Sequence, residues 1–73
     1  MDHLSDSEKE GAVFQVFPRD PAMLVSAVNM RLRNNYPDGV DQLCLDLDID
    51  RDVLVGILAK NGFDYMPAIN QFR

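Results

Sequence analysis

The stretch LCLDLDIDRDVLVGIL, residues 43–58, has the residue spacing of a helix-turn-helix. Cys44 is the small residue at the close approach of the two helices, and Ile49 is the apolar residue in the turn. Asp50 supplies a side-chain oxygen that can cap the second helix. Asp48 stands where such turns usually carry glycine, and aspartate tolerates the left-handed conformation better than most residues. The stretch therefore predicts two short helices that pack against each other.

Length and composition restrict the chain to one small domain. With 73 residues it can bury only a marginal core, and chains of this size often depend on a staple, a metal or a partner chain. Cys44 is the only cysteine, so no disulfide forms within the chain, and an apolar helix face suits it as a small buried side chain. No apolar run approaches the ~20 residues of a membrane span, and the acidic start MDHLSDSEKE is unlike a signal peptide. We therefore expect a protein of the reducing cytoplasm that does not contact membranes.

Helix starts and ends are marked along the rest of the chain. Asp20 and Pro21 provide a cap oxygen followed by proline at the first helical position, and Gly62 stands where a left-handed helix end belongs. Asn29, at the boundary of the core, is expected to tie the first helix to a neighbouring loop. We expect a mainly α fold, a three-helix, helix-turn-helix-like bundle with a small C-terminal β-hairpin in the place of a rudimentary wing. The expected elements are helices from 21 to about 34 or 35, from about 40 to 47 and from 51 to about 61, and strands over 63–66 and 69–72.

The N-terminal segment is less regular than the rest. Residues 1–12 are polar and charged and predict a disordered tail, which leaves residues 13–73 as the single domain. Residues 13–17 (VFQVF) are β-branched and aromatic, which is typical of a strand, and an extended arm laid over the core is the alternative. Both interpretations stay open. An isolated two-stranded hairpin is marginally stable, so the C-terminal hairpin must either pack on the helices or pair with residues 13–17.

Residues 18–72 resemble a known family. The runs PRDPAMLVSAVNMRLR (18–33) and VDQLCLDLDID (40–50), with Tyr36 between them and NQF (70–72) at the end, are similar to a small bacterial family, domain of unknown function 4250. Its most specific part is the pattern D-P-x-x-L-x-S-x-x-N-x-x-L-R, which begins at Asp20. The turn at 37–39 is longer than the family's usual entry to the second helix, and the residues before 18 have no family counterpart. The resemblance implies a bacterial origin and a shared architecture, and it implies no activity.

The charge distribution argues against a nucleic-acid partner. The net charge is −5, and residues 38–64 alone hold seven carboxylates against two cations, which also gives −5. A duplex binder gains most of its affinity by placing lysine and arginine on phosphates, whereas this segment repels them. The basic residues that could help, Arg19, Arg31, Arg33 and Arg73, lie away from the helix that would read the bases.

No catalytic or metal-binding motif accompanies these features. Alternating aspartates at 46, 48, 50 and 52 suggest a calcium loop, but its sixth and twelfth positions hold Arg51 and Ile57 in place of glycine and glutamate. A turn, a helix cap and the helix dipole explain these aspartates better. His3 is the only histidine, and it has no cysteine or second histidine beside it. We expect no enzyme activity, no metal, no cofactor and no small-molecule substrate.

Three apolar surfaces are candidates for contact with another protein. Gly56, on the outward face of the third helix, costs about 1 kcal/mol of helix stability relative to alanine, which suggests either a close approach by another helix or simple tolerance. The first helix carries a second apolar stripe opposite its core-facing side. Either Phe14, Val16, Phe17 or the hairpin covers this stripe, or it is a methionine-rich docking surface. The candidate interaction residues are Val55, Gly56, Ala59, Leu45, Met23 and Met30.

Two functions from different classes are compatible with these residues. The acidic surface and the exposed apolar residues favour a non-enzymatic protein–protein interaction module, whose partner is another protein or a second copy of the chain. The alternative is a nucleic-acid-binding, transcription-related winged helix-turn-helix, which rests on the spacing of residues 43–58. We favour the interaction module, because electrostatics supplies most non-specific affinity for nucleic acid.

Overall fold

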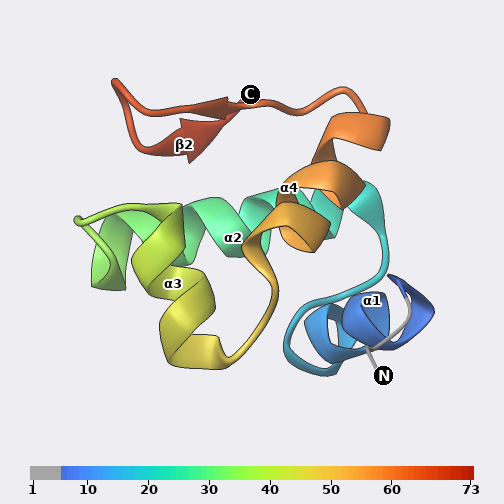
Figure 1. Cartoon of the computed structure of the whole chain (residues 1–73). Helices are drawn as coiled ribbons and strands as arrows, with labels where there is room; N and C mark the ends of the chain where they lie inside the picture. Colours follow the sequence, from blue (N-terminus) through green and yellow to red (C-terminus); the bar gives the residue numbers. More distant parts are fainter. Residues whose placement is uncertain (1–5) are drawn as a thin grey trace.

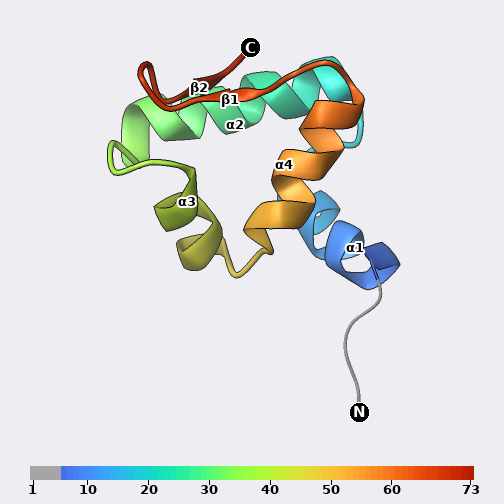
Figure 2. The same cartoon turned by 45° about the horizontal axis from the view of Figure 1, so that its top comes forward.

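Four helices and a two-stranded hairpin build the part of the chain that the structure describes, residues 6–73 of a computed structural model (Figure 1). Helix α4 packs against both α1 and α3, and the hairpin lies along α2 (Figure 2). The expectation of a mainly α fold with a small C-terminal hairpin is confirmed. The elements are α1 (Asp6–Val16), α2 (Pro21–Asn35), α3 (Val40–Leu47), α4 (Arg51–Lys60), β1 (Tyr65–Met66) and β2 (Gln71–Phe72).

The unit α3–turn–α4 has the connection that its sequence predicts. Asp48 ends α3 in the left-handed conformation, with φ 58° and ψ 47°, and its N–H donates to the carbonyl of Cys44. Asp50 precedes α4, and its Oδ1 accepts a hydrogen bond from the N–H of Val53 at 3.0 Å. Ile49 between them is largely buried. Aspartate thus fills the position where glycine is usual, and the cap fixes the start of α4.

The N-terminal segment differs from the sequence expectation. Residues 6–12 belong to α1 where the sequence predicts a disordered tail, and the first five residues of that predicted tail lie outside the described residues. The strand or extended arm expected at 13–17 is instead the last turn of the same helix and its end. Val13 and Phe17 lie one helical turn apart, and both are buried, with 0% and 4% of their surface exposed. Burial of this pair stabilises a helix whose local preference is weak.

Side-chain amides hold the hairpin on α2. Asn29 donates to the carbonyl of Phe72 at 3.0 Å and accepts from its N–H at 2.7 Å. Asn70, in the left-handed conformation with φ 54°, donates to the carbonyls of Leu32 and Tyr36 at the end of α2. The expected role of Asn29 is confirmed, and its partner is the strand β2. These hydrogen bonds compensate for the small size of a two-residue ladder.

The core lies between the helices and beneath β2. Cys44 is 2% exposed, which confirms its expected place as a small buried side chain. Within the described residues, no helix combines the length and the apolar composition needed to cross a membrane. The buried hydrophobic residues are Val13, Phe17, Leu24, Val28, Leu32, Val40, Leu43, Cys44, Ile49, Leu54, Ile57, Leu58 and Phe72.

Candidate interaction surfaces

The outward face of α4 is smaller than the sequence suggests. Val55 is only partly exposed and packs against the core, while Ala59 is exposed. A Cβ atom built on Gly56 would meet no atom within 4 Å, so no described part of the chain makes a close approach there. Nothing within the described chain requires a glycine at position 56, and the approach of a helix from another chain stays a prediction. What remains on this face is a small surface with little apolar area.

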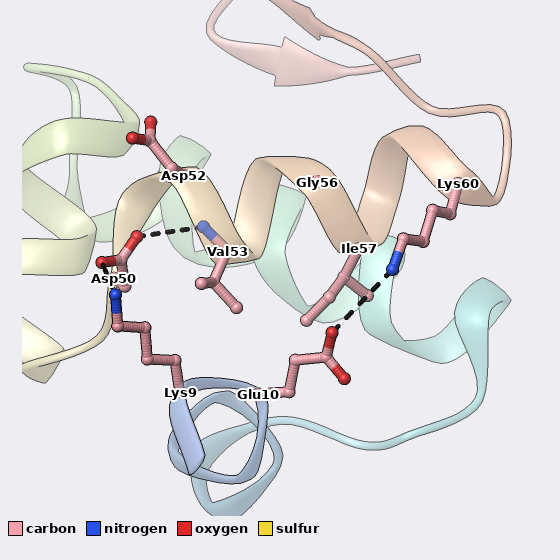
Figure 3. Close-up of a pocket in the computed structure, with 8 residues that line it drawn as sticks. All are labelled: Lys9, Glu10, Asp50, Asp52, Val53, Gly56, Ile57 and Lys60. Carbon is pink, nitrogen blue, oxygen red and sulfur yellow. Dashed lines mark hydrogen bonds and ion pairs between the residues drawn. The ribbon is translucent and has the colours of Figure 1, made fainter. Parts of the chain in front are cut away.

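A hollow of about 300 Å³ lies between α1 and α4 (Figure 3). Lys9 Nζ and Asp50 Oδ2 form an ion pair at 3.7 Å at one end, and Lys60 Nζ and Glu10 Oε2 form another at 4.0 Å at the other end. Both pairs are partly open to solvent, so each contributes little stability. The lining residues are Lys9, Glu10, Asp50, Asp52, Val53, Gly56, Ile57 and Lys60.

The charges around this hollow do not converge on a ligand. Figure 3 shows Asp50 and Asp52 at one end of α4 and Glu10 near the other, and Lys9 and Lys60 are engaged with carboxylates. Among the described residues, no group of three or more metal-ligating side chains is close enough to hold an ion. The two ion pairs therefore connect α1 to α4 at the two ends of the hollow.

The aspartates of the α3–α4 region have structural partners. Asp48 ends α3 and Asp50 caps α4, as the turn-and-cap interpretation predicts. Asp46 accepts a hydrogen bond from the hydroxyl of Tyr36 at 2.5 Å, which raises the pKa of Tyr36. Asp52 pairs with Arg51 at 3.2 Å. The carboxylates of Asp46, Asp50 and Asp52 are directed to different partners, and no group of three metal-ligating side chains forms among the described residues.

Cys44 is not placed to act as a nucleophile. Burial, and after it the carboxylates of Asp41 and Asp50, raise the pKa of its thiol to about 11 against an opposing effect of Arg51. A thiol with this pKa is protonated at neutral pH, and the thiolate is the reactive form. The side chain is part of the core and carries no surface chemistry.

The outer face of α2 remains open. Met23 and Met30 are 59% and 52% exposed, so the interpretation in which Phe14, Val16, Phe17 or the hairpin covers this stripe is wrong for both methionines. The two phenylalanines instead lie under arginines. The guanidinium carbon of Arg19 is 4.8 Å from the ring centroid of Phe14, and that of Arg31 is 5.7 Å from that of Phe17.

Positive charge flanks these methionines. Helix α2 contains Arg31 and Arg33 and no carboxylate. On a helical wheel the two arginines lie roughly 80° to either side of the line through Met23 and Met30. Ala27 lies between the methionines along the helix and is partly buried. We call Met23, Ala27, Met30, Arg31 and Arg33 the α2 face.

A second, acidic surface lies on α3. Leu45 is 75% exposed, the highest value among the large exposed hydrophobic residues of the described chain. Asp41, Asp46 and Asp48 are exposed on the same helix and at its end, within four residues of Leu45. Arg51 offsets part of this charge, since its Nε contacts Asp41 Oδ1 at 2.5 Å. We call Leu45, Asp41, Asp46 and Asp48 the α3 face.

Sequence reasoning missed the contribution of α1 to these surfaces. Lys9 and Glu10 line the hollow, but the expected disordered tail gives them no structural role. The available indication was the spacing of Val13 and Phe17, which places both on one side of a helix. The six candidate residues are not brought together: Met23 and Met30 lie on α2, Leu45 on α3, and Val55, Gly56 and Ala59 on α4.

Comparison with known proteins identifies the helical unit. The model of the family named domain of unknown function (DUF4250) matches residues 18–72, which contain α2, α3, α4 and both strands. No curated protein and no solved structure matches the chain. Helix α1 precedes the matched segment, so the hollow between α1 and α4 joins the family unit to residues outside the match. The chain belongs to the DUF4250 family.

Proposed function

We propose that this chain is a non-enzymatic protein–protein interaction module and that its docking surface is the α2 face. The observation that carries the proposal is the exposure of two methionines on one helix that has arginines on both flanks. Methionine is flexible and polarisable and suits adaptable binding surfaces. Covering the exposed half of each methionine contributes about 1 kcal/mol per side chain. The single buried cysteine suits a reducing bacterial cytoplasm as the setting.

The α2 face is a better docking surface than the outward face of α4. Helix α1 lies along one side of α4, and Val55 packs against the core. Of the candidate residues on α4, this leaves Gly56 and Ala59 for contact with a partner. These two residues supply little area for hydrophobic contact. The α2 face offers two long apolar side chains, and its charge is opposite to that of most of the protein surface.

The nucleic-acid alternative has weak support in the same geometry. Asp50 and Asp52 stand at the start of α4, the helix that would enter a groove, and Lys9 and Glu10 flank it from α1. Carboxylates at this position repel phosphates. Arginines on α2 supply positive charge, but they surround methionines on a different helix. Duplex binding is therefore an outcome that our test must be able to detect.

The test is affinity capture from host lysate, with and without nuclease, followed by the same capture with purified partner. The variant is Met23→Glu with Met30→Glu, which removes the apolar part of the α2 face at exposed helix positions. Gln15→Glu, at an exposed position of α1, controls for added negative charge. We expect a partner whose capture is unaffected by nuclease. It should bind the wild type and Gln15→Glu and should not bind the methionine variant. If nuclease removes the captured material, or if the methionine variant still binds the partner, the proposal is contradicted.

A further inference from the structure

We propose that the α2 face docks the α3 face of a second copy of this chain, so that copies associate head to tail. This inference rests on the proposed function, because it names the partner of the same docking surface. The two faces are exposed, carry opposite charges and lie on different helices.

The two faces match in apolar shape. Met23 and Met30 are seven residues apart, which separates them by about 10.5 Å along the helix. Ala27 between them has a single methyl group, so the α2 face presents one short apolar side chain between two long ones. Leu45 is a single, highly exposed side chain with no other large hydrophobic residue exposed on its helix. We infer that this leucine packs over Ala27 between the two methionines, in the way that a knob fills a hole between helices.

The two faces also match in charge. Arg31 and Arg33 are both exposed, and neither makes an ion pair within the described residues, although Arg31 lies over the ring of Phe17. Asp46 and Asp48 likewise have no cationic partner in the described part of the chain. Complementary charges fix the orientation of two docked surfaces and disfavour wrong partners. Guanidinium groups on both flanks of the methionines can therefore face carboxylates on both flanks of Leu45.

The positions of the faces decide the type of assembly. Helices α2 and α3 contact each other within one copy (Figure 1), and the two faces are formed by different residues on these two helices. One copy thus offers its α2 face to one neighbour and its α3 face to another. A contact between two different surfaces is heterologous, and it continues from copy to copy unless a ring closes. A closed twofold dimer is not expected.

The first experiment measures mass against concentration by sedimentation velocity on the full chain, up to millimolar protein. A standard interface buries about 800 Å² per partner, and two helix faces offer less, so association is expected to be weak. We expect the average mass of the wild type to rise from the 8.3 kDa of one copy and to continue past two copies. Gln15→Glu should behave like the wild type, because its charge is added away from both faces. A wild type that stays monomeric, or that stops at a dimer, overturns the inference.

The second experiment is a complementation test. Met30→Glu destroys the α2 face, Leu45→Glu destroys the α3 face, and both positions are exposed, so both variants should fold. Each variant alone should lose association. An equimolar mixture should form a one-to-one dimer and stop there, because one intact face of each kind remains. Persistent association of either variant alone, or a mixture that stays monomeric, overturns the inference.

Nuclear magnetic resonance then locates the contact in that mixture. With isotope-labelled Leu45→Glu and unlabelled Met30→Glu, the shifts should concentrate at residues 23–33 and be absent from 41–48. Reversing the label should reverse the pattern, and any other distribution overturns the inference. If the chain proves monomeric but a captured protein still depends on Met23 and Met30, only the second copy is excluded as the partner. If neither self-association nor the binding of a captured protein depends on Met23 and Met30, the proposed function fails as well.

Discussion

Replacing Gly56 by alanine should stabilise the protein. Gly56 lies inside α4 without a positive φ, and a Cβ atom there would meet nothing within 4 Å. Alanine therefore adds no clash, and it removes the cost of a glycine in a helix interior, which is about 1 kcal/mol. A gain of that size raises the Tm of a domain of this length by about 4–8 °C.

Gly62 provides the matched control for this prediction. A Cβ atom at Gly62 also meets nothing within 4 Å, but its φ is +88°. The two positions thus have the same space for a Cβ atom and differ in backbone conformation. Alanine at Gly62 should destabilise the protein by about 1–2 kcal/mol, since a left-handed conformation is costly for a residue with a Cβ atom.

Urea unfolding followed by circular dichroism measures both changes. The free energy of unfolding should increase for Gly56→Ala and decrease for Gly62→Ala, with unchanged dependence on urea concentration. A neutral or destabilising Gly56→Ala would refute the reasoning, because it would mean that the space beside α4 is not free. Gly56→Ala should also keep the association of the wild type, since Gly56 lies on neither proposed face. Loss of association would move the contact to α4.

Three further predictions concern the fold. Asn29→Ala should lower the free energy of unfolding in urea by about 1–3 kcal/mol, because it leaves two backbone groups of β2 without partners, whereas Ser26→Ala on the exposed side should change it little. Val13→Ala should cost about 2 kcal/mol in the same assay, and the more exposed Val16→Ala much less, if α1 is packed as described; equal effects would contradict that packing. Cys44 keeps its proton in the native state up to a pKa of about 11, against 9.0 for an unperturbed thiol, so the native state binds more protons between these values. Stability should therefore fall as the pH rises from 9.0 to about 11, and Cys44→Ala should remove that part of the pH dependence in thermal unfolding.

The elements that sequence predicted well are those fixed by neighbours in the chain. Asp20 and Asp50 each cap a helix through an N–H three residues further on, at 3.0 Å in both cases. Asp48 ends α3 by its own backbone conformation. Such features need no knowledge of distant residues, and their pattern predicts the bounds of α2 and α3 as the structure has them.

The parts that sequence did not predict depend on distant contacts. Helix α1 has polar and apolar residues spread around its circumference, so its helical period is weak, and it is held by the burial of Val13 and Phe17. Asn70 satisfies carbonyls of Leu32 and Tyr36, 38 and 34 residues earlier in the chain. One of the two interpretations of the methionine stripe has Phe14 and Phe17 among the residues that cover it, but Arg19 lies over the ring of Phe14 and Arg31 over that of Phe17. Each case is decided by tertiary packing, which local preference does not contain.

The residues that carry the family resemblance mostly build the fold. Asp20 caps α2, Leu24 and Leu32 fill the core, and Asn29 holds β2. Arg33 is different, because it is exposed and has no ion pair within the described chain.

A shared fold does not determine a shared partner, since function depends on sites placed on the fold. Met23 and Met30 fall at positions that the family's most specific pattern leaves open, and they are not needed for the core. An exposed apolar side chain that contributes little to folding can be changed without unfolding the protein. For this reason the docking surface can be tested by substitution independently of the fold. Arg33 belongs to both, because it is part of the family's pattern and also lies on the α2 face.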